Sequence, residues 1–378
     1  MATAITTSSN TTKPDDSLIL QARDLKKHFP IQRGFLRRTI GAVRAVDGVD
    51  LTIRKGEIHG LVGESGSGKT TTGRMLLRAI DPTSGEIWFQ DQALGWVDVA
   101  TLDKHKLRQA RRNMKIVYQD PYSSLNPRMT VQQIVGEHLK VNKQLSGKAL
   151  DKRVGELLEL VGLRPEYAQR YPHAFSGGQR QRLAIARALS MQPQLLVCDE
   201  PVSALDVSVQ AQILRLLREL QEQFGLSYLF VAHDLSVVEN VSDHVSVMYV
   251  GQIVETAPTY DLYRHPLHPY TEALMSAVPK PDPKAVKNRI VLQGEVPSPA
   301  NPPSGCYFHP RCRYAQEICR TTAPKLEEIR PNHLARCHFA RELHLQGVAT
   351  GDGGPPIPNQ AKPHPTSPTS TPPPMQAD

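Results

Sequence analysis

A glycine-rich stretch, GESGSGKT at Gly63–Thr70, constrains the fold of this chain more than any other feature. It follows a short apolar run, Ile58–Val62, and it leads into a segment with helical composition, Thr70–Ile80. In such a loop, glycines allow successive backbone N–H groups to point at a phosphate beside a helix N-terminus. Lys69 is placed to reach the β- and γ-phosphates of a nucleotide, and the Thr70 hydroxyl is placed to ligate Mg²⁺. The stretch alone predicts a nucleotide site without specifying the class of protein.

A second stretch, FSGGQRQR at Phe175–Arg182, lies ahead of an apolar run that ends in two acids, LLVCDE at Leu195–Glu200. Adjacent carboxylates at the end of a buried strand are costly unless a cation or hydrogen bonds compensate them. Asp199 is therefore expected to hold Mg²⁺ through water, opposite Thr70. Glu200 is expected to orient and deprotonate the attacking water.

In this order the two stretches resemble the ATP-binding subunits of ABC transporters. The resemblance implies an α/β fold: a RecA-like parallel sheet core, an antiparallel β subdomain and a helical subdomain. It implies ATP and Mg²⁺ as cofactors, with Thr70, Gln119 and Asp199 as the Mg²⁺ residues. The implied contacts of the loop with ATP are Gly63, Glu64, Ser65, Gly66, Ser67, Gly68, Lys69, Thr70 and Thr71.

The resemblance also assigns roles outside these two stretches. It implies that Gln119 senses Mg²⁺ and the attacking water, that His233 contacts the γ-phosphate, and that Phe29 stacks on adenine. It further implies a head-to-tail dimer, in which the SGGQ residues complete the nucleotide site of the facing protomer rather than their own. These residues are Ser176, Gly177, Gly178 and Gln179.

The order of sequence patterns predicts four regions. Residues 1–16 are expected to be a disordered leader and residues 17–260 an ABC ATPase domain, because strand-like and helix-like segments alternate there as in a parallel sheet covered on both faces. Charged segments of helical period predict a helical subdomain at about residues 90–190. Residues 261–345 are expected to form a small cysteine-containing extension, and the Pro-rich residues 346–378 a disordered tail.

Composition limits the compartment and the partners. The chain is 39% hydrophobic, and no window of it approaches the ~18 uncharged apolar residues of a membrane span. It carries 45 Lys and Arg against 37 Asp and Glu, a formal charge of +8, but the basic residues are scattered. Scattered charge favours an ordinary solvated surface over a nucleic-acid site. We therefore expect no nucleic-acid partner and a peripheral position on the cytoplasmic face of the inner membrane.

Two further stretches, Gln119–Thr130 and His268–Pro279, resemble the ATPase subunits of dipeptide/oligopeptide importers. That resemblance implies two transmembrane permease subunits, a second and different ATPase subunit, and an extracytoplasmic substrate-binding protein. The segment Tyr122–Arg128 is expected to face the membrane subunits. A nickel or glutathione importer of the same subfamily is an alternative, and a soluble ABC ATPase acting in DNA repair or on ribosomes is a more distant one.

Four of the five cysteines lie close together: Cys306, Cys312, Cys319 and Cys337. A cytosolic location argues against disulfides, and no C-x₂₋₄-C pair typical of zinc fingers is present. Irregularly spaced thiolates suit a [4Fe–4S] cluster, which the resemblance also implies, while zinc or free thiols stay open. The nearby Arg311, Arg313 and Arg320 are expected to temper the negative charge of such a cluster. The fifth cysteine, Cys198, is expected to be a core residue.

Overall fold

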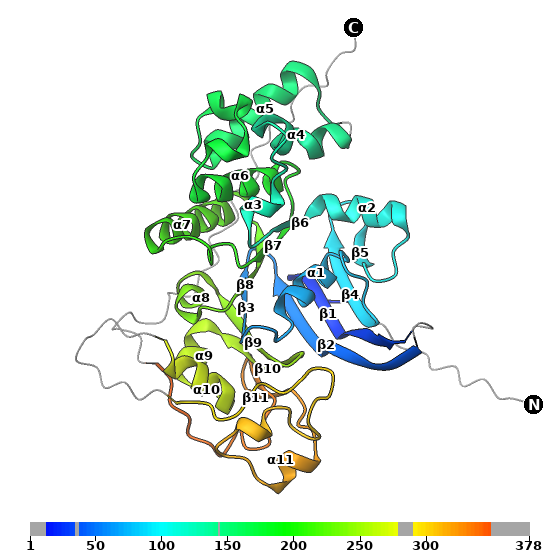
Figure 1. The fold of residues 1–378 in the computed structure, drawn as a ribbon, viewed down its shortest axis with the longest axis vertical. Coiled ribbons are helices and arrows are strands. Elements are labelled where there is room, and N and C mark those ends of the chain that lie inside the picture. Colours follow the sequence, from blue (N-terminus) through cyan, green and yellow to red (C-terminus); the bar gives the residue numbers. More distant parts are fainter. Residues whose placement is uncertain (1–12, 35–37, 143, 279–289, 349–378) are drawn as a thin grey trace, which may run out of the picture.

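The computed structural model describes residues 13–34, 38–142, 144–278 and 290–348. The chain builds two β-sheets, a group of helices at one end of the long axis and a C-terminal segment at the other end (Figure 1). The predicted leader and tail lie largely outside the described residues. None of the described helices is long and apolar enough to cross a membrane.

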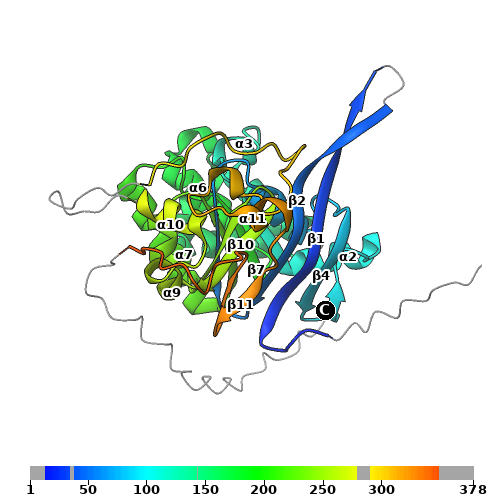
Figure 2. The ribbon, with the colours of Figure 1, turned by 90° about the horizontal axis from the view of Figure 1, so that it is seen from below.

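The smaller sheet is antiparallel, in the order β2-β1-β4-β5, as the alternating pattern of the N-terminal region predicts. Its two longest strands pair along their whole length and project beyond the body of the molecule (Figure 2). The strands are β1 (Leu18–Arg33), β2 (Arg38–Arg54), β4 (Ser84–Asp91) and β5 (Gly95–Asp98).

The larger sheet has the order β11-β12-β10-β9-β3-β8-β7-β6. Strands β9, β3, β8, β7 and β6 run parallel, so their carboxyl ends meet at one edge, while β10, β12 and β11 add antiparallel pairs. The strands are β3 (Ile58–Val62), β6 (Met114–Val117), β7 (Leu195–Asp199), β8 (Ser227–Ala232), β9 (His244–Tyr249), β10 (Gln252–Pro258), β11 (Glu327–Arg330) and β12 (His333–Ala335).

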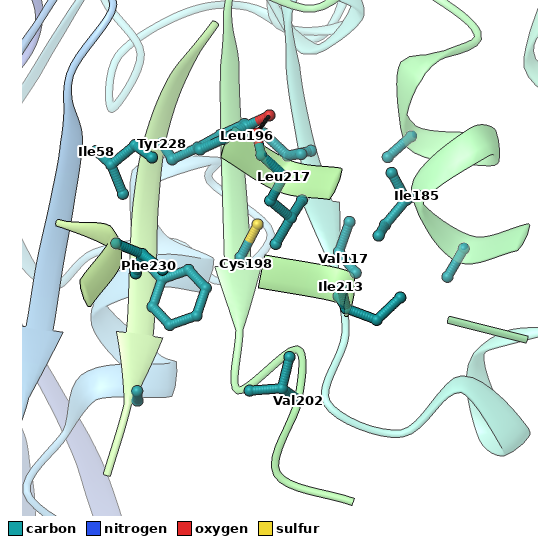
Figure 3. Close-up of a cluster of buried hydrophobic side chains, with 14 of the residues drawn as sticks. Ile58, Val117, Ile185, Leu196, Cys198, Val202, Ile213, Leu217, Tyr228 and Phe230 are labelled. Carbon is teal, nitrogen blue, oxygen red and sulfur yellow. Dashed lines mark hydrogen bonds between the residues drawn. The ribbon is translucent and has the colours of Figure 1, made fainter. Parts of the chain in front are cut away.

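The strands at the centre of this sheet are buried along their whole length because both faces are covered. Leu196 and Cys198 of β7 pack on one face with Phe230 and with Ile213 of α7 (Figure 3). Cys198 has no exposed surface, and burial raises the pKa of its thiol. The prediction of a core cysteine is thus confirmed. The helices that accompany the sheet are α1 (Lys69–Leu76), α2 (Lys104–Asn113), α7 (Val207–Phe224) and α8 (Leu235–Val241).

The separate helical group lies between β6 and β7 in the chain. It begins at Pro121, and not near residue 90, because the chain after residue 90 completes the antiparallel sheet and then forms α2 and β6. Its helices are α3 (Pro121–Ser124), α4 (Val131–Val141), α5 (Gly147–Leu160) and α6 (Gly177–Leu189), with 3₁₀ turns η1 (Pro165–Gln169) and η2 (Pro172–Ala174).

The C-terminal segment is part of the larger sheet and does not form a separate domain beside it. Strand β12 pairs with β10, and a buried carboxylate on β10, Glu255, accepts from the backbone N–H groups of Leu267 and His268 and contacts His333 Nε2 at 2.7 Å. The sheet is therefore continuous across the predicted boundary at residue 260. The remaining elements are α9 (Thr259–Arg264), α10 (Pro269–Ser276), η3 (His309–Arg311) and α11 (Glu317–Thr321).

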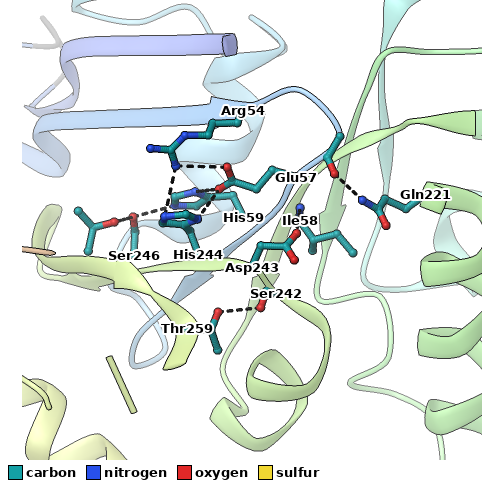
Figure 4. Close-up of polar contacts among 12 residues, drawn as sticks. Arg54, Glu57, Ile58, His59, Gln221, Ser242, Asp243, His244, Ser246 and Thr259 are labelled. Atoms are coloured by element: carbon teal, nitrogen blue, oxygen red, sulfur yellow. Dashed lines mark hydrogen bonds and ion pairs between the residues drawn. The ribbon is translucent and has the colours of Figure 1, made fainter. Parts of the chain in front are cut away.

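A buried polar cluster fastens β3 to β9 at the amino end of the parallel strands (Figure 4). The Glu57 carboxylate lies 3.1 Å from His59 Nδ1 and 3.3 Å from His244 Nδ1, and the two imidazole rings stack. Burial opposes ionisation of Glu57, but His59, His244 and Arg54 outweigh it and lower its pKa. This cluster has the character of a structural brace, since it lies at the end of the strands away from the glycine-rich loop.

Candidate active site

The glycine-rich loop connects the end of β3 to the start of α1, as predicted. Three of its glycines have positive φ, and two of these have no room for a side chain. A Cβ on Gly63 would lie 2.1 Å from the Met248 carbonyl oxygen, and one on Gly68 would lie 2.2 Å from the Ala45 carbonyl oxygen. Close packing against β9 and β2 therefore fixes the curl of the loop.

Lys69 is buried, and its ammonium group bends back over the loop. Its Nζ donates to the carbonyl oxygens of Gly63 at 2.8 Å and of Glu64 at 2.9 Å. Burial lowers its pKa, while the nearby carboxylates of Glu200, Asp199 and Glu64 act in the opposite direction. A phosphate placed on the loop would give this buried cation an anionic partner.

Two of the three residues predicted to handle Mg²⁺, Thr70 and Asp199, are in direct contact. Thr70 Oγ1, in the first turn of α1, donates to Asp199 Oδ1 at the end of β7, at 2.8 Å. Burial raises the pKa of Asp199 despite this hydrogen bond, and Arg74 lies 3.8 Å from the carboxylate. A hydroxyl and a buried, under-compensated carboxylate fit the oxygen ligands that Mg²⁺ prefers beside nucleotide phosphates.

The three predicted catalytic side chains are brought together from three strand ends. Gln119 Nε2 donates to Glu200 Oε2 at 2.9 Å, and His233 Nδ1 lies 3.0 Å from the same oxygen. Glu200 has a φ of 47°, a left-handed backbone conformation that is unusual for a non-glycine residue. Its N–H donates to the Val231 carbonyl and its carbonyl accepts from Ser203 Oγ, which stabilises this turn. Gln119 contacts Glu200, and none of its described hydrogen bonds reaches Asp199.

The SGGQ residues form the N-terminus of α6. Ser176 Oγ accepts from the Gln179 N–H and Gln179 Oε1 accepts from the Ser176 N–H, so the two side chains form a capping box. Gly178 packs against α7, where an added Cβ would lie 2.4 Å from Val209 Cγ1. The prediction that these residues serve a facing protomer stays a prediction, because one chain contains no facing protomer.

Phe29 lies on β1 and is 39% exposed as a residue, and Lys27 Nζ is 5.1 Å from the centroid of its ring. An exposed ring is available for stacking on a base, so its predicted contact with adenine stands as a prediction. Of the other loop residues, Ser67 donates its backbone N–H to the Glu64 carbonyl, and the Glu64 side chain pairs with Arg311.

The four clustered cysteines are free thiols that line one small pocket. The predicted metal centre is not supported, because no group of three or more His, Cys, Asp or Glu side chains in the described ranges is placed to hold a metal ion. Burial raises the pKa of the Cys306, Cys312 and Cys337 thiols, to about 11 for Cys312 and about 12 for Cys337, which favours the protonated form of these three. Arg311 and Arg313, expected to temper a cluster, instead pair with the carboxylates of Glu64 and Glu272.

Comparison with known proteins agrees with this geometry. Residues 46–203 match the family described as ABC transporter, and residues 254–319 match the family described as oligopeptide/dipeptide transporter, C-terminal region. The oligopeptide transport ATP-binding protein AppF of Bacillus subtilis is 50% identical over 331 residues, which are 87% of this chain and 99% of AppF. The chain belongs to the ABC transporter ATP-binding family.

Other relatives agree with this assignment. The probable peptide ABC transporter ATP-binding protein y4tS of Sinorhizobium fredii is 49% identical over 85% of this chain and 89% of its own length. The cassette MJ0796, solved as a dimer in a post-hydrolysis state bound to ADP and Pi, is 28% identical with a TM-score of 0.55. It covers 64% of this chain and 98% of its own. The predicted ABC ATPase fold and ATPase activity are thus confirmed.

Sequence reasoning missed two contacts of this ABC site, both made by the C-terminal segment. Arg311 Nη1 donates to Glu64 Oε2 at 2.7 Å, and the hydroxyl of Tyr270 accepts from the Glu64 N–H at 2.8 Å. Arg311 and Glu64 are 247 residues apart in the chain, and no local pattern signals their pairing.

Asp199→Asn is expected to raise the free energy of unfolding of the Mg²⁺-free protein at neutral pH. The pKa of Asp199 is raised in the fold, so its ionised form is disfavoured there. This destabilisation is present above the folded pKa and disappears as the pH falls below the ordinary value of about 3.9. The asparagine still accepts from Thr70.

Urea unfolding in chelator, at pH 7 and at pH 4, measures the difference. The free energy of unfolding of the variant should exceed that of the wild type by more at pH 7 than at pH 4. The Mg²⁺-dependent ATP hydrolysis of the variant should be lost. If the difference in free energy of unfolding between variant and wild type is the same at both pH values, the destabilisation does not come from the ionised form of Asp199.

Proposed function

We propose that this chain is the ATP-hydrolysing subunit of a peptide importer, in which ATP binding closes a head-to-tail ATPase dimer and hydrolysis reopens it. The match of residues 254–319 to the C-terminal region of oligopeptide/dipeptide transporters carries this proposal. Relatives about 50% identical over nearly their full length, with names that include oligopeptide transport or peptide import, support it.

The geometry around Glu200 supports its role as the base. Gln119 and His233 both contact Oε2, and among the described residues no hydrogen bond reaches Oε1, which leaves Oε1 for the attacking water. Glu200 then takes the proton of that water while Lys69 holds the β- and γ-phosphates. Mg²⁺, held by Thr70 and Asp199, supplies charge compensation for the phosphates when it is bound.

The dimer is proposed from the N-terminus of α6. Its side-chain cap leaves backbone N–H groups of Gly177 and Gly178 at a helix N-terminus, which favours phosphate binding. The cassette MJ0796, described as dimeric, supports the arrangement by analogy. We propose a second, different ATPase subunit as the partner, so that each nucleotide lies between the loop of one subunit and the SGGQ residues of the other.

The proposed complex contains two transmembrane permeases and an extracytoplasmic substrate-binding protein, with this subunit on the cytoplasmic face of the membrane. Nickel or glutathione cargo, or a soluble ATPase without a permease, are the alternatives. Co-purification of the chain with permeases, together with uptake of labelled di- and oligopeptides by the assembled transporter, would support the proposal. Uptake of nickel or glutathione alone, or a chain that binds no permease, would replace it.

Two substitutions separate nucleotide binding from hydrolysis. Glu200→Gln should retain ATP binding and trap a closed dimer, with a loss of turnover of ~10²–10⁴ because the base is removed. Lys69→Ala should weaken ATP binding itself, since its ammonium is the cation of the loop. Equilibrium binding of ATP and phosphate release by the assembled transporter measure the two effects. Wild-type turnover of Glu200→Gln would remove the assignment of Glu200 as the base.

Docking to the permeases is proposed for the segment that follows Gln119. Within it Tyr122 is 63% exposed and carries Arg180 over its ring, whereas Leu125 is 2% exposed and belongs to the core. Tyr122→Ala should reduce transport several-fold, as expected for an aromatic contact at an interface, and should leave ATP hydrolysis by the isolated subunit unchanged. Phe224→Ala, at an exposed aromatic position at the end of α7, is the matched control. Equal loss of transport in both variants would contradict docking at Tyr122.

We further propose that the pocket of Cys306, Cys312, Cys319 and Cys337 binds a [4Fe–4S] cluster. The four cysteines line one pocket, which supports this proposal, and binding of the cluster would have to bring their sulfur atoms into ligating positions that they do not occupy in the described structure. Anaerobically purified protein should be brown and contain about four irons per chain, the stoichiometry of such a cluster. Colourless protein with one zinc would replace iron by zinc, and four thiols that titrate freely without metal would exclude both. None of these outcomes tests the ATP site, which is tested separately by ATP binding of the Lys69→Ala variant.

A further inference from the structure

Arg311, in the C-terminal segment, makes a forked contact with the phosphate loop. Its Nη1 donates to Glu64 Oε2 at 2.7 Å and its Nη2 donates to Glu64 Oε1 at 3.2 Å. The Arg311 side chain is only 7% exposed. A two-point guanidinium–carboxylate contact at a buried position fixes the direction of the Glu64 side chain as well as its charge.

Glu64 is held at each of its polar groups. Arg311 holds the carboxylate, the hydroxyl of Tyr270 accepts from the backbone N–H at 2.8 Å, and Lys69 Nζ donates to the carbonyl oxygen at 2.9 Å. Two of these three partners belong to the chain after residue 260. The conformation of the loop next to its catalytic lysine therefore depends on the C-terminal segment.

The pairing also has an electrostatic consequence for nucleotide binding. Phosphates bring several negative charges to a loop that already contains the Glu64 carboxylate. If the Glu64 carboxylate were unpaired, its negative charge on the same loop would repel the phosphates. Because Arg311 neutralises Glu64, the loop presents the charge of Lys69 to the phosphates without the added repulsion of an unpaired Glu64 carboxylate.

The turn that carries Arg311 is attached to the cysteine pocket. The His309 N–H donates to the Cys306 carbonyl at 3.0 Å, and the Cys312 N–H donates to the His309 carbonyl at 3.3 Å. Arg311 thus lies on the short turn η3 between two residues that line the pocket. A second guanidinium of this segment, Arg313, pairs instead with Glu272 inside the C-terminal segment, at 2.9 Å.

We propose that Arg311 is a positioning residue for ATP binding. It orients Glu64 and cancels its charge, so the C-terminal segment sets the affinity of the phosphate loop for nucleotide. The inference rests on the proposed ATP site at Lys69.

The test compares the Kd for Mg²⁺–ATP and the thermal midpoint of the full-length chain in five forms: wild type, Arg311→Gln, Arg311→Gln with Glu64→Gln, Arg313→Gln and Lys69→Ala. Arg311→Gln should raise the Kd on the order of tenfold, within the usual range of coupling between sites. The double variant should bind more tightly than Arg311→Gln, because it removes the carboxylate left unpaired. Arg313→Gln, the matched loss of an ion pair in the same segment, should keep the wild-type Kd.

Recovery in the double variant is the outcome that a purely structural role of Arg311 would not produce. A wild-type Kd for Arg311→Gln, or no recovery in the double variant, would overturn the inference. If Arg311→Gln does not fold, Arg311→Lys replaces it, because lysine keeps the positive charge but cannot make the two-point contact with Glu64. A Kd of Arg311→Lys above that of the wild type would support the inference. A Kd equal to that of the wild type would overturn it. Wild-type binding by Lys69→Ala would instead overturn the proposed ATP site.

Discussion

The close packing of the phosphate loop is the constraint on which the rest of the structure depends. Backbone carbonyls of β9 and β2 lie where side chains of Gly63 and Gly68 would be. The Gly251 N–H, in the turn after β9, donates to the Ser67 carbonyl, and the Gly251 carbonyl accepts from the Asp47 N–H. The loop is therefore one place at which the two sheets are joined, beside the hydrophobic core that they share, and a movement of either sheet would change the phosphate site.

The two adjacent carboxylates at the end of β7 have different surroundings, and these surroundings suit them to different roles. Asp199 is 2% exposed and bonded to the Thr70 hydroxyl, and this burial favours a tightly held cation. Glu200 is turned out of the strand by its left-handed backbone toward Gln119 and His233. One peptide bond thus separates a group suited to binding a metal from a group suited to accepting a proton. The positive φ of Glu200 is a conformation that a catalytic role can explain.

How well a feature could be predicted from the sequence depends on how far apart along the chain the residues that form it lie. Gly63, Lys69, Asp199 and Glu200 lie in patterns of a few residues, and parallel strands bring their carboxyl ends to one edge, so most of the core fold and the catalytic cluster could be predicted. The ion pair of Arg311 with Glu64 could not, because it depends on tertiary packing between distant segments.

Other failures have the same origin. The helical group begins later than its charged pattern suggested, because β5, just after residue 90, pairs with the preceding strand β4 and completes the antiparallel sheet, whose other strands, β1 and β2, lie earlier in the chain. The grouping of the cysteines predicted a metal centre, but whether their sulfur atoms are placed to hold a metal depends on side-chain geometry, and in the described ranges they line one pocket without such a placement. The extension of the larger sheet by β12 was also invisible, since a three-residue strand has almost no sequence signal.

The attachment of β12 to β10 and of Arg311 to Glu64 has a consequence for biosynthesis. A ribosome delivers the phosphate loop early and its last two supports, Tyr270 and Arg311, about two hundred residues later. Until then the edge of β10 lacks its neighbour and Glu64 lacks its counter-charge. The nucleotide site therefore matures only after Arg311 has been synthesised, so a nascent or truncated chain that stops before this residue lacks the paired loop of the folded subunit.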